Sequence, residues 1–255
     1  MKLPSFLPAT ARQESAYLDD GLAIAVRDKG TVAFERADFL SVDASASADK
    51  TRSTTGFAIG GRFCRFVSLP WSELLLDSAA AAAYYHSAFT EVYGDVAPGT
   101  SFAAADEARG QARVVCALEP SLVDAVQAWA ASHGRRVAFI RPAVQVAFAS
   151  FRAQMQGEAG FFALREATEL SLLCWEAGRV AEVDVFPIDG RDWRSRLDDE
   201  VTRARLQSGN AGVLYVADAW SGDAEIPGGD AIVLSWPAFA TAAPNPMSRL
   251  ATCGL

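Results

Sequence analysis

The stretch FALREATELSLLCWEAGRV, residues 162–180, alternates strand-like runs with short breaks. It reads as a strand, a break at Arg165-Glu166-Ala167, a second strand, a turn at Ala177-Gly178 and the start of a third strand. Many nucleotide-binding folds open a domain with such a hairpin and use its first break to hold phosphate. The question is whether this break has phosphate-binding chemistry or only the shape.

The order of elements that begins with this hairpin occurs twice in the chain. Short strands lead into a helix, and strands and helices then alternate, which predicts an α/β fold with two similar subdomains. We place them at residues 1–157 and, in a shorter copy, 158–236, followed by a proline-containing tail at 237–255 that we expect to be extended or disordered. The expected strands are 22–28, 31–36, 62–70, 112–119, 136–140, 161–165, 168–176, 179–186, 211–218 and 231–236, and the expected helices are 71–94, 120–134, 142–155 and 190–207.

The segment 41–61 is rich in Ser, Ala, Asp and Thr. Runs of such residues between periodic segments are typical of loops. We therefore predict a long loop here, before the strand at 62–70.

Composition excludes several classes of protein. The 255 residues carry a net charge of −8 without a basic stripe, which argues against a nucleic-acid partner. No signal peptide is visible, and no apolar run is long enough to span a membrane. We expect a soluble cytoplasmic protein with no direct membrane span.

Residues suited to metal binding or conventional catalysis are scarce. The chain has four cysteines without a Cys-x-x-Cys pair and only two histidines, His86 and His133. Cys64, Cys116 and Cys174 lie in apolar runs, so we expect buried, reduced thiols. No metal site and no catalytic residue is predicted, and a conventional enzyme finds little support.

Three segments carry a resemblance to a known family. They are FVSLPWSELLLDSAAAAAYYHSAFTEVYG (66–94), ARVVCALEPSLVDAVQAWAASHGRRVAFIRPAV (112–144) and FFALREATELSLLCWEAGRV (161–180). With the duplicated element order, they resemble the actin-like (ribonuclease H-like) ATPase fold. Within it they resemble the branch of the type IV pilus protein PilM and the cytoplasmic domain of the type II secretion protein GspL, over residues 62–186.

This resemblance implies an assembly-platform role on the cytoplasmic face of the inner membrane. Members of this branch bind the cytoplasmic segment of a bitopic inner-membrane partner, PilN-like or GspM-like. The implied partners are such a protein and a second copy of the chain, as a homodimer. The protein would be peripheral to the membrane through its partner.

The resemblance also implies where nucleotide would bind. Actin-like ATPases place an acidic residue and glycines in the turn that follows the first strand of each half, for magnesium and phosphate. In the first half, VRDKGTV offers Asp28, Gly30 and Thr31, whereas Asp19-Asp20-Gly21 precedes the predicted strand. In the second half, Glu166 and Thr168 remain, but alanine replaces the glycine. The third, adenosine-supporting turn has Ala217-Asp218-Ala219 in place of Gly-Gly, and Gly228-Gly229 lies before a strand instead.

Three hypotheses follow. The first is a non-catalytic scaffold, a pseudo-ATPase without a cofactor. The second is a working ATPase or kinase that binds ATP with magnesium through Asp28, Gly30, Thr31, Glu166 and Thr168. The third is an unrelated small-molecule α/β enzyme.

Overall fold

The frame of the protein is a pair of five-stranded mixed sheets. A computed structural model describes residues 13–19, 22–28, 31–37, 54–104, 107–188, 192–220, 231–236, 241, 243 and 245–254. The first sheet has the spatial order β3 (Thr31–Ala37), β2 (Leu22–Asp28), β1 (Gln13–Leu18), β4 (Thr54–Ile59), β8 (Arg136–Pro142). The second has the order β11 (Arg179–Pro187), β10 (Glu169–Glu176), β9 (Gly160–Arg165), β12 (Val213–Asp218), β13 (Ala231–Val233).

Both sheets are built on one plan. In each, three antiparallel strands are joined in sequence, and two further strands add in parallel beside the first of them. The two-residue turn at Ala177-Gly178 between β10 and β11 has positive φ at both positions, as a tight hairpin requires. The predicted duplication of the element order is confirmed, while a domain boundary near residue 157 stays a prediction.

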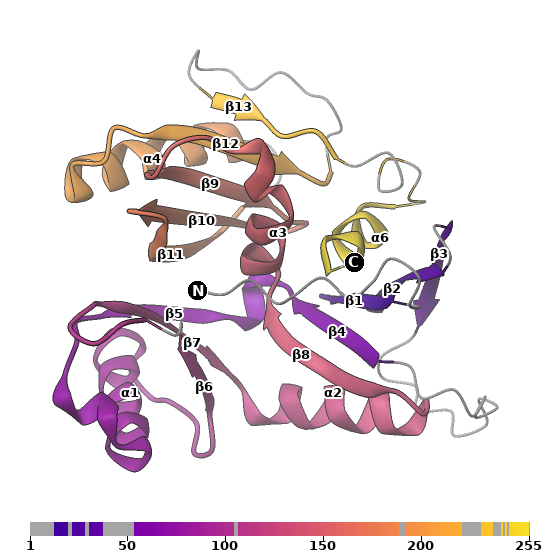
Figure 1. The fold of residues 1–255 in the computed structure, drawn as a ribbon, viewed down its shortest axis with the longest axis horizontal. Coiled ribbons are helices and arrows are strands. Elements are labelled where there is room, and N and C mark those ends of the chain that lie inside the picture. Colours follow the sequence, from indigo (N-terminus) through magenta and orange to yellow (C-terminus); the bar gives the residue numbers. More distant parts are fainter. Residues whose placement is uncertain are drawn as a thin grey trace.

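A third, smaller sheet is inserted between β4 and β8. It consists of β5 (Arg65–Leu69), β7 (Arg113–Leu118) and β6 (Ser101–Ala104), all antiparallel. Helix α1 (Ser78–Tyr93) packs on it through Tyr85 and Phe89, and α2 (Pro120–Ser132) lies along β8 (Figure 1). This insertion makes the first half of the chain the larger one.

Helix α3 (Ala143–Phe151) joins the two main sheets. Its buried residues belong to one core that includes Phe57 of β4 and Phe162 of β9. The single-turn helix η3 (Arg152–Gln154) follows it. Helix α4 (Trp193–Ser208) forms a separate core on the opposite face of the second sheet. All six residues of β9 are buried, because helices cover both faces of its sheet.

The helix boundaries follow capping chemistry, with one correction. The predicted helix at 71–94 begins later, at Ser78, because Asp77 caps α1 by accepting a 2.8 Å hydrogen bond from the Ala80 N–H. Ser72 instead caps the short helix η2 (Glu73–Leu76). Gly94 ends α1 with φ of 79°, a conformation that suits glycine.

Three strands were missed by the sequence prediction: β6 of the inserted sheet, and two strands of the first sheet. Strand β1 was not expected, and β4 lies inside the segment predicted as a loop at 41–61, of which residues 41–53 are outside the described part. The expected strand at 62–70 starts at Arg65, after the single-turn helix η1 (Gly61–Phe63). Strands β1 and β4 are central in the first sheet, so missing them misplaces the turns predicted for that sheet.

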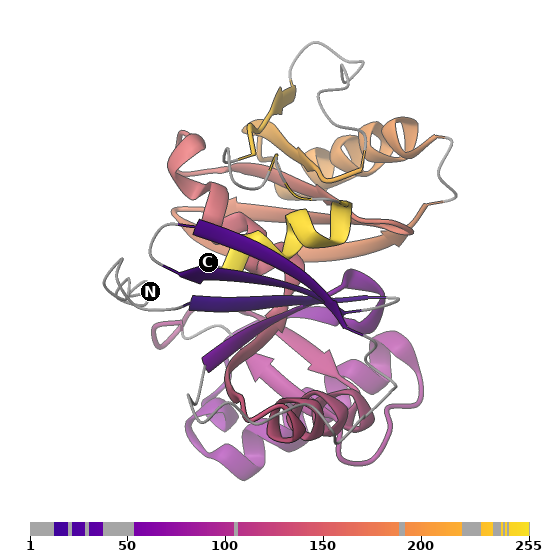
Figure 2. The same ribbon diagram turned by 90° about the vertical axis from the view of Figure 1, so that its right-hand side faces the viewer.

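The prediction of an extended or disordered tail is also wrong for the part that the structure describes. Residues 246–254 form α6 (Pro246–Ala251) and η4 (Thr252–Gly254) instead of an extended or disordered segment. Asn245 caps α6 by accepting from the Ser248 N–H, and Leu250 and Ala251 are buried. Figures 1 and 2 show α6 beside β1 and β2, which it contacts, and its buried residues join the core that the two main sheets share.

The cysteines match expectation within the described residues. All four cysteines are free thiols, and Cys64, Cys116 and Cys174 are buried. Among the residues that the structure describes, no helix combines the length and apolar character needed to cross a membrane.

Candidate functional site

The two sheets meet at equivalent turns. Strands β1 and β9 hold the same place in their sheets, and an acidic residue follows each of them: Asp19 after β1 and Glu166 after β9. The Tyr17 hydroxyl lies between the two carboxylates, 2.9 Å from Glu166 Oε1 and 3.3 Å from Asp19 Oδ2. One phenol has one proton to donate, so the two carboxylates share a single donor here.

Glu166 is held by donors from both halves of the chain. The Gly61 N–H lies 3.1 Å from each of its two carboxylate oxygens, and the Ser171 hydroxyl lies 3.2 Å from Oε2. A Cβ on Gly61 would lie only 2.8 Å from Glu166 Oε2. Glycine is therefore what lets this backbone approach the carboxylate so closely.

Burial sets the acidity of this pair. Glu166 is fully buried, and this raises its pKa to about 7. Hydrogen bonds from Tyr17, Gly61 and Ser171 lower the pKa, and the nearby charge of Asp19 raises it. The pKa of Tyr17 is raised well above its usual value, first by burial and then by the Glu166 and Asp19 charges.

Arginines accompany the other two acidic residues of the turns. Arg62 Nε lies 3.0 Å from Asp19 Oδ1, and Arg165 Nη1 lies 3.2 Å from Asp218 Oδ2. Asp218 directly ends β12, beside β9, and it also accepts a 2.8 Å hydrogen bond from the Trp220 N–H. The three turns thus combine acidic side chains with hydrogen bonds and ion pairs from the protein itself.

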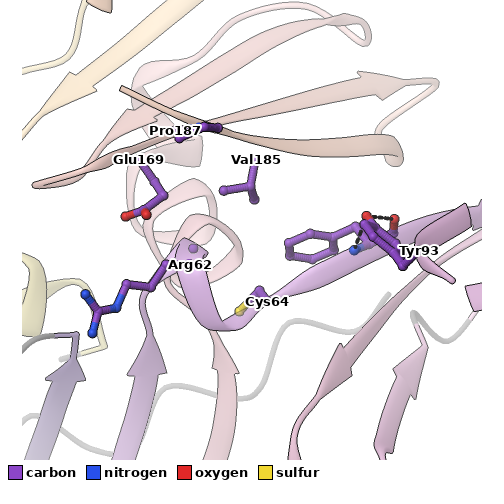
Figure 3. A pocket seen from close by; sticks show the side chains of 8 residues that line it. Arg62, Cys64, Tyr93, Glu169, Val185 and Pro187 are labelled. Carbon is purple, nitrogen blue, oxygen red and sulfur yellow. Dashed lines mark hydrogen bonds between the residues drawn. The ribbon is translucent and has the colours of Figure 1, made fainter. Parts of the chain in front are cut away.

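A cavity of about 230 Å³ lies beside these turns, between the second sheet and the inserted sheet. Figure 3 shows Glu169 and Val185 reaching toward it from the second sheet, with Arg62 and Cys64 on the other side. The Tyr93 hydroxyl bonds the backbone of Phe66 at its far end. Both halves of the chain therefore contribute its walls.

Comparisons with known proteins address the fold. A scan against protein-family models found no match, and a search of curated proteins found none. The structure is similar to the cytoplasmic domain of EpsL, an inner-membrane component of the type II secretion system of Vibrio cholerae. The TM-score is 0.60 at 12% identity, over 95% of this chain and 94% of that one.

Two further solved structures agree. A Bacteroides thetaiotaomicron protein of unknown function, described as having an actin-like ATPase fold, matches with a TM-score of 0.57 at 11% identity, over 98% of this chain and 99% of that one. A chain of the PilM–PilN type IV pilus biogenesis complex matches with a TM-score of 0.55 at 12% identity, over 82% of each chain. This chain has the actin-like ATPase fold.

In this actin-like fold, the predicted first-half site residues lie away from the shared turns. Asp28 and Thr31 pair with each other across the β2–β3 turn, at the opposite end of β2 from Asp19. A strand of seven residues puts the two ends about 20 Å apart. Gly30 is outside the described residues. The structure therefore does not bring Asp28 and Thr31 together with Glu166.

The residue that sequence reasoning set aside is Asp19. It was taken to precede the first strand of the sheet, but it follows β1, which places it in the turn equivalent to that of Glu166. Its signal was present in Asp19-Asp20-Gly21, yet recognising it required β1, whose residues QESAYL read as largely polar. Asp20 and Gly21 lie outside the described residues.

The second-half site residues separate as well. Glu166 faces the first sheet, whereas the Thr168 hydroxyl donates a 2.6 Å hydrogen bond to the carboxylate of Glu169 and is exposed. The backbone N–H of Glu166 bonds the Glu169 carbonyl and closes the turn. Only one of the two predicted residues therefore points toward the place where the halves meet.

Magnesium-ATP needs approachable backbone N–H groups and carboxylates open to metal-bound water. In the β9–β10 turn, Ala167 replaces the glycine, and the Glu166 carboxylate accepts hydrogen bonds from the protein. In the third turn, Asp218 is paired with Arg165, and Gly228-Gly229 is outside the described residues. Within the described ranges, no three metal-ligating side chains gather. These two turns, as described, do not fit a triphosphate with magnesium.

Proposed function

We propose that this chain is a non-catalytic cytoplasmic scaffold of an assembly platform, of the type IV pilus or type II secretion kind. In this role it binds the cytoplasmic segment of a bitopic inner-membrane protein, PilN-like or GspM-like. It is peripheral to the membrane through that partner and pairs with a second copy of itself. The proposal involves no nucleotide turnover and no cofactor.

Two similarities support the platform part. One similar structure is an inner-membrane component of a type II secretion system, and another comes from a complex of PilM with PilN. At 12% identity these matches establish a shared fold, so the role and the partner are carried to this chain as a proposal.

The observation that carries the non-catalytic part is the direction of the Glu166 side chain. Its carboxylate bonds Gly61, Tyr17 and Ser171 inside the protein, so it is not turned toward a site for metal-bound water. Releasing it would leave a buried backbone N–H and two hydroxyls without this acceptor, which is costly. A scaffold needs the two halves held in place, and this arrangement holds them.

The alternative is a working ATPase or kinase of the same fold. One observation favours it: Asp19 and Glu166 are carboxylates in equivalent turns, which is the chemistry that a magnesium-nucleotide site would use. It requires Glu166 to leave its three donors when nucleotide binds.

Partner binding is the direct test. The chain is co-expressed with the cytoplasmic segment of a bitopic membrane protein encoded beside it, fused to a carrier, and the complex is measured by size-exclusion chromatography. The proposal expects co-elution after nucleotide and magnesium have been removed with apyrase and EDTA. A segment of the same composition in scrambled order is the control. Absence of co-elution, or co-elution only with ATP, contradicts the proposal.

A further inference from the structure

Glu166 fills a buried site whose hydrogen-bond donors are arranged around a carboxyl group. Three neutral donors converge on its carboxylate: a backbone N–H from Gly61, a phenol from Tyr17 and a hydroxyl from Ser171. They come from η1, β1 and β10, so two of the three belong to the first half of the chain. Proteins bind oxyanions with this combination of backbone and hydroxyl donors in a water-poor site.

The backbone at Gly61 is fitted to the anion. Its N–H reaches both carboxylate oxygens, and the space where a side chain would begin is bounded by Glu166 Oε2 at 2.8 Å and Ser171 Oγ at 2.9 Å. The site is fully buried: the exposed fraction is 0% for each of Glu166, Tyr17 and Ser171. The donors are therefore placed in advance and are shielded from water, which strengthens each hydrogen bond.

We infer that these donors form a carboxyl-binding site that the chain occupies with its own Glu166 side chain. The ligand class is a small carboxylate, and the tether supplies it at high effective concentration. In this arrangement Glu166 stands where a free anion would otherwise connect the β9–β10 turn to β1 and η1. The halves are then joined with no ligand from solution.

Removing the tethered carboxylate tests this assignment. Glu166→Ala deletes the CH₂–COO⁻ group beyond Cβ, and acetate has nearly the same shape. Thermal unfolding is measured at pH 7.5 in 50 mM sodium acetate, sodium phosphate or sodium chloride. We expect acetate to raise the midpoint of the variant by about 3–6 °C over chloride, if the concentration is about ten times the dissociation constant. The wild-type chain should show no such difference.

Two controls separate this effect from general salt stabilisation. Glu169→Ala removes a carboxylate three residues away, which accepts a hydrogen bond from the Thr168 hydroxyl. It should not respond to acetate. Phosphate distinguishes the sources of oxyanion: a response to acetate alone assigns a carboxylate site, and an equal response to phosphate assigns a general oxyanion site. Both responses support the inference.

A second variant covers the case in which the alanine variant does not fold. Glu166→Ser keeps a small polar side chain at this position and is tested in the same way. Absence of an acetate response in both variants, or an equal response in Glu169→Ala, overturns the inference. The inference does not rest on the proposed function: magnesium-ATP binding by the wild-type chain would contradict the scaffold and would leave the acetate result unaffected.

Discussion

The two acidic turns occupy the same position in their sheets, but they lie in different surroundings. Asp19, after β1, is paired with Arg62, whose side chain is about one-third exposed at 34%. Glu166, after β9, meets only neutral donors among its hydrogen-bond partners and is fully buried. The carboxylate of the first turn thus lies beside a partly hydrated arginine. The carboxyl group of the second turn accepts hydrogen bonds from neutral groups in a buried site.

This difference shows how a duplicated fold can keep the shape of a site while its chemistry changes. A carboxylate beside a cation is favoured in its ionised form, whereas a carboxylate in a dry site is favoured as the neutral acid. Burial accordingly raises the pKa of Glu166 to about 7. The second turn has become a link between the halves, and its stability depends on how little water reaches it.

The largest effect is expected from removing one cation in each half. Arg165→Met weakens the pairing of Asp218 in a site where both side chains are at most 10% exposed. The free energy of unfolding should decrease by about 3 kcal/mol, as is typical when one partner of a buried ion pair is removed. Arg62→Met should cost about 1 kcal/mol because water reaches its side chain. Urea unfolding measures the decrease in the free energy of unfolding of each variant. Equal decreases would contradict the difference proposed between the two sites.

A smaller change in stability is expected from substituting Gly60 or Gly61, the two glycines after β4. Each of them lies close to one of the two acidic turns. A Cβ on Gly61 would lie 2.8 Å from Glu166, whereas a Cβ on Gly60 would lie 3.2 Å from the Leu18 carbonyl and 3.3 Å from Asp19. We expect Gly61→Ala to cost about 2 kcal/mol and Gly60→Ala about 1 kcal/mol. The free energies of unfolding in guanidinium chloride provide the test, and a larger loss at Gly60 would reverse the order.

The smallest effect is the pH dependence of Glu166. Because its pKa rises from 4.5 to about 7 on folding, the stability that it contributes is complete below pH 4.5 and is lost as the pH rises through 7. Between pH 6 and pH 8 the loss should be about 1 kcal/mol. Glu166→Gln, which resembles the neutral acid, should lack this component. The free energy of unfolding of both proteins is measured at the two pH values. A decrease that is about 1 kcal/mol larger in the wild-type chain is expected, and an equal change in both proteins would contradict the prediction.

The sequence predicts the second sheet more closely than the first. Strands β9, β10 and β11 are marked by apolar runs and by the Ala177-Gly178 turn, and the structure places them within one residue of expectation. The first sheet depends on β1 and β4, which carry polar residues at buried positions. Glu14 and Thr55 are both buried and bond each other at 2.9 Å. The hydrogen bond between them offsets the free-energy cost of burying polar groups. This pairing cannot be recognised from the sequence, because the two residues lie far apart along the chain.

The same hidden pairing explains why the predicted site residues of the first half lie apart from Glu166. Without β1, the first turn was assigned to Asp28 and Thr31, at the end of β2 opposite to Asp19. Glu166 could be named from the sequence because β9 was recognised. Its partners Tyr17 and Gly61 could not be named, since they come from the other sheet and lie 149 and 105 residues away along the chain.

Thermal unfolding of the wild-type chain with and without millimolar magnesium-ATP tests the central claim most directly. A ligand present at about 100 times its dissociation constant adds roughly 2.7 kcal/mol, which moves the midpoint of a chain of this length by about 5–10 °C. The account predicts no shift beyond that caused by magnesium and an equal ionic strength of salt, because Glu166 remains bonded to Gly61 and Tyr17. A shift of 5–10 °C would contradict the non-catalytic scaffold and would favour a working nucleotide site.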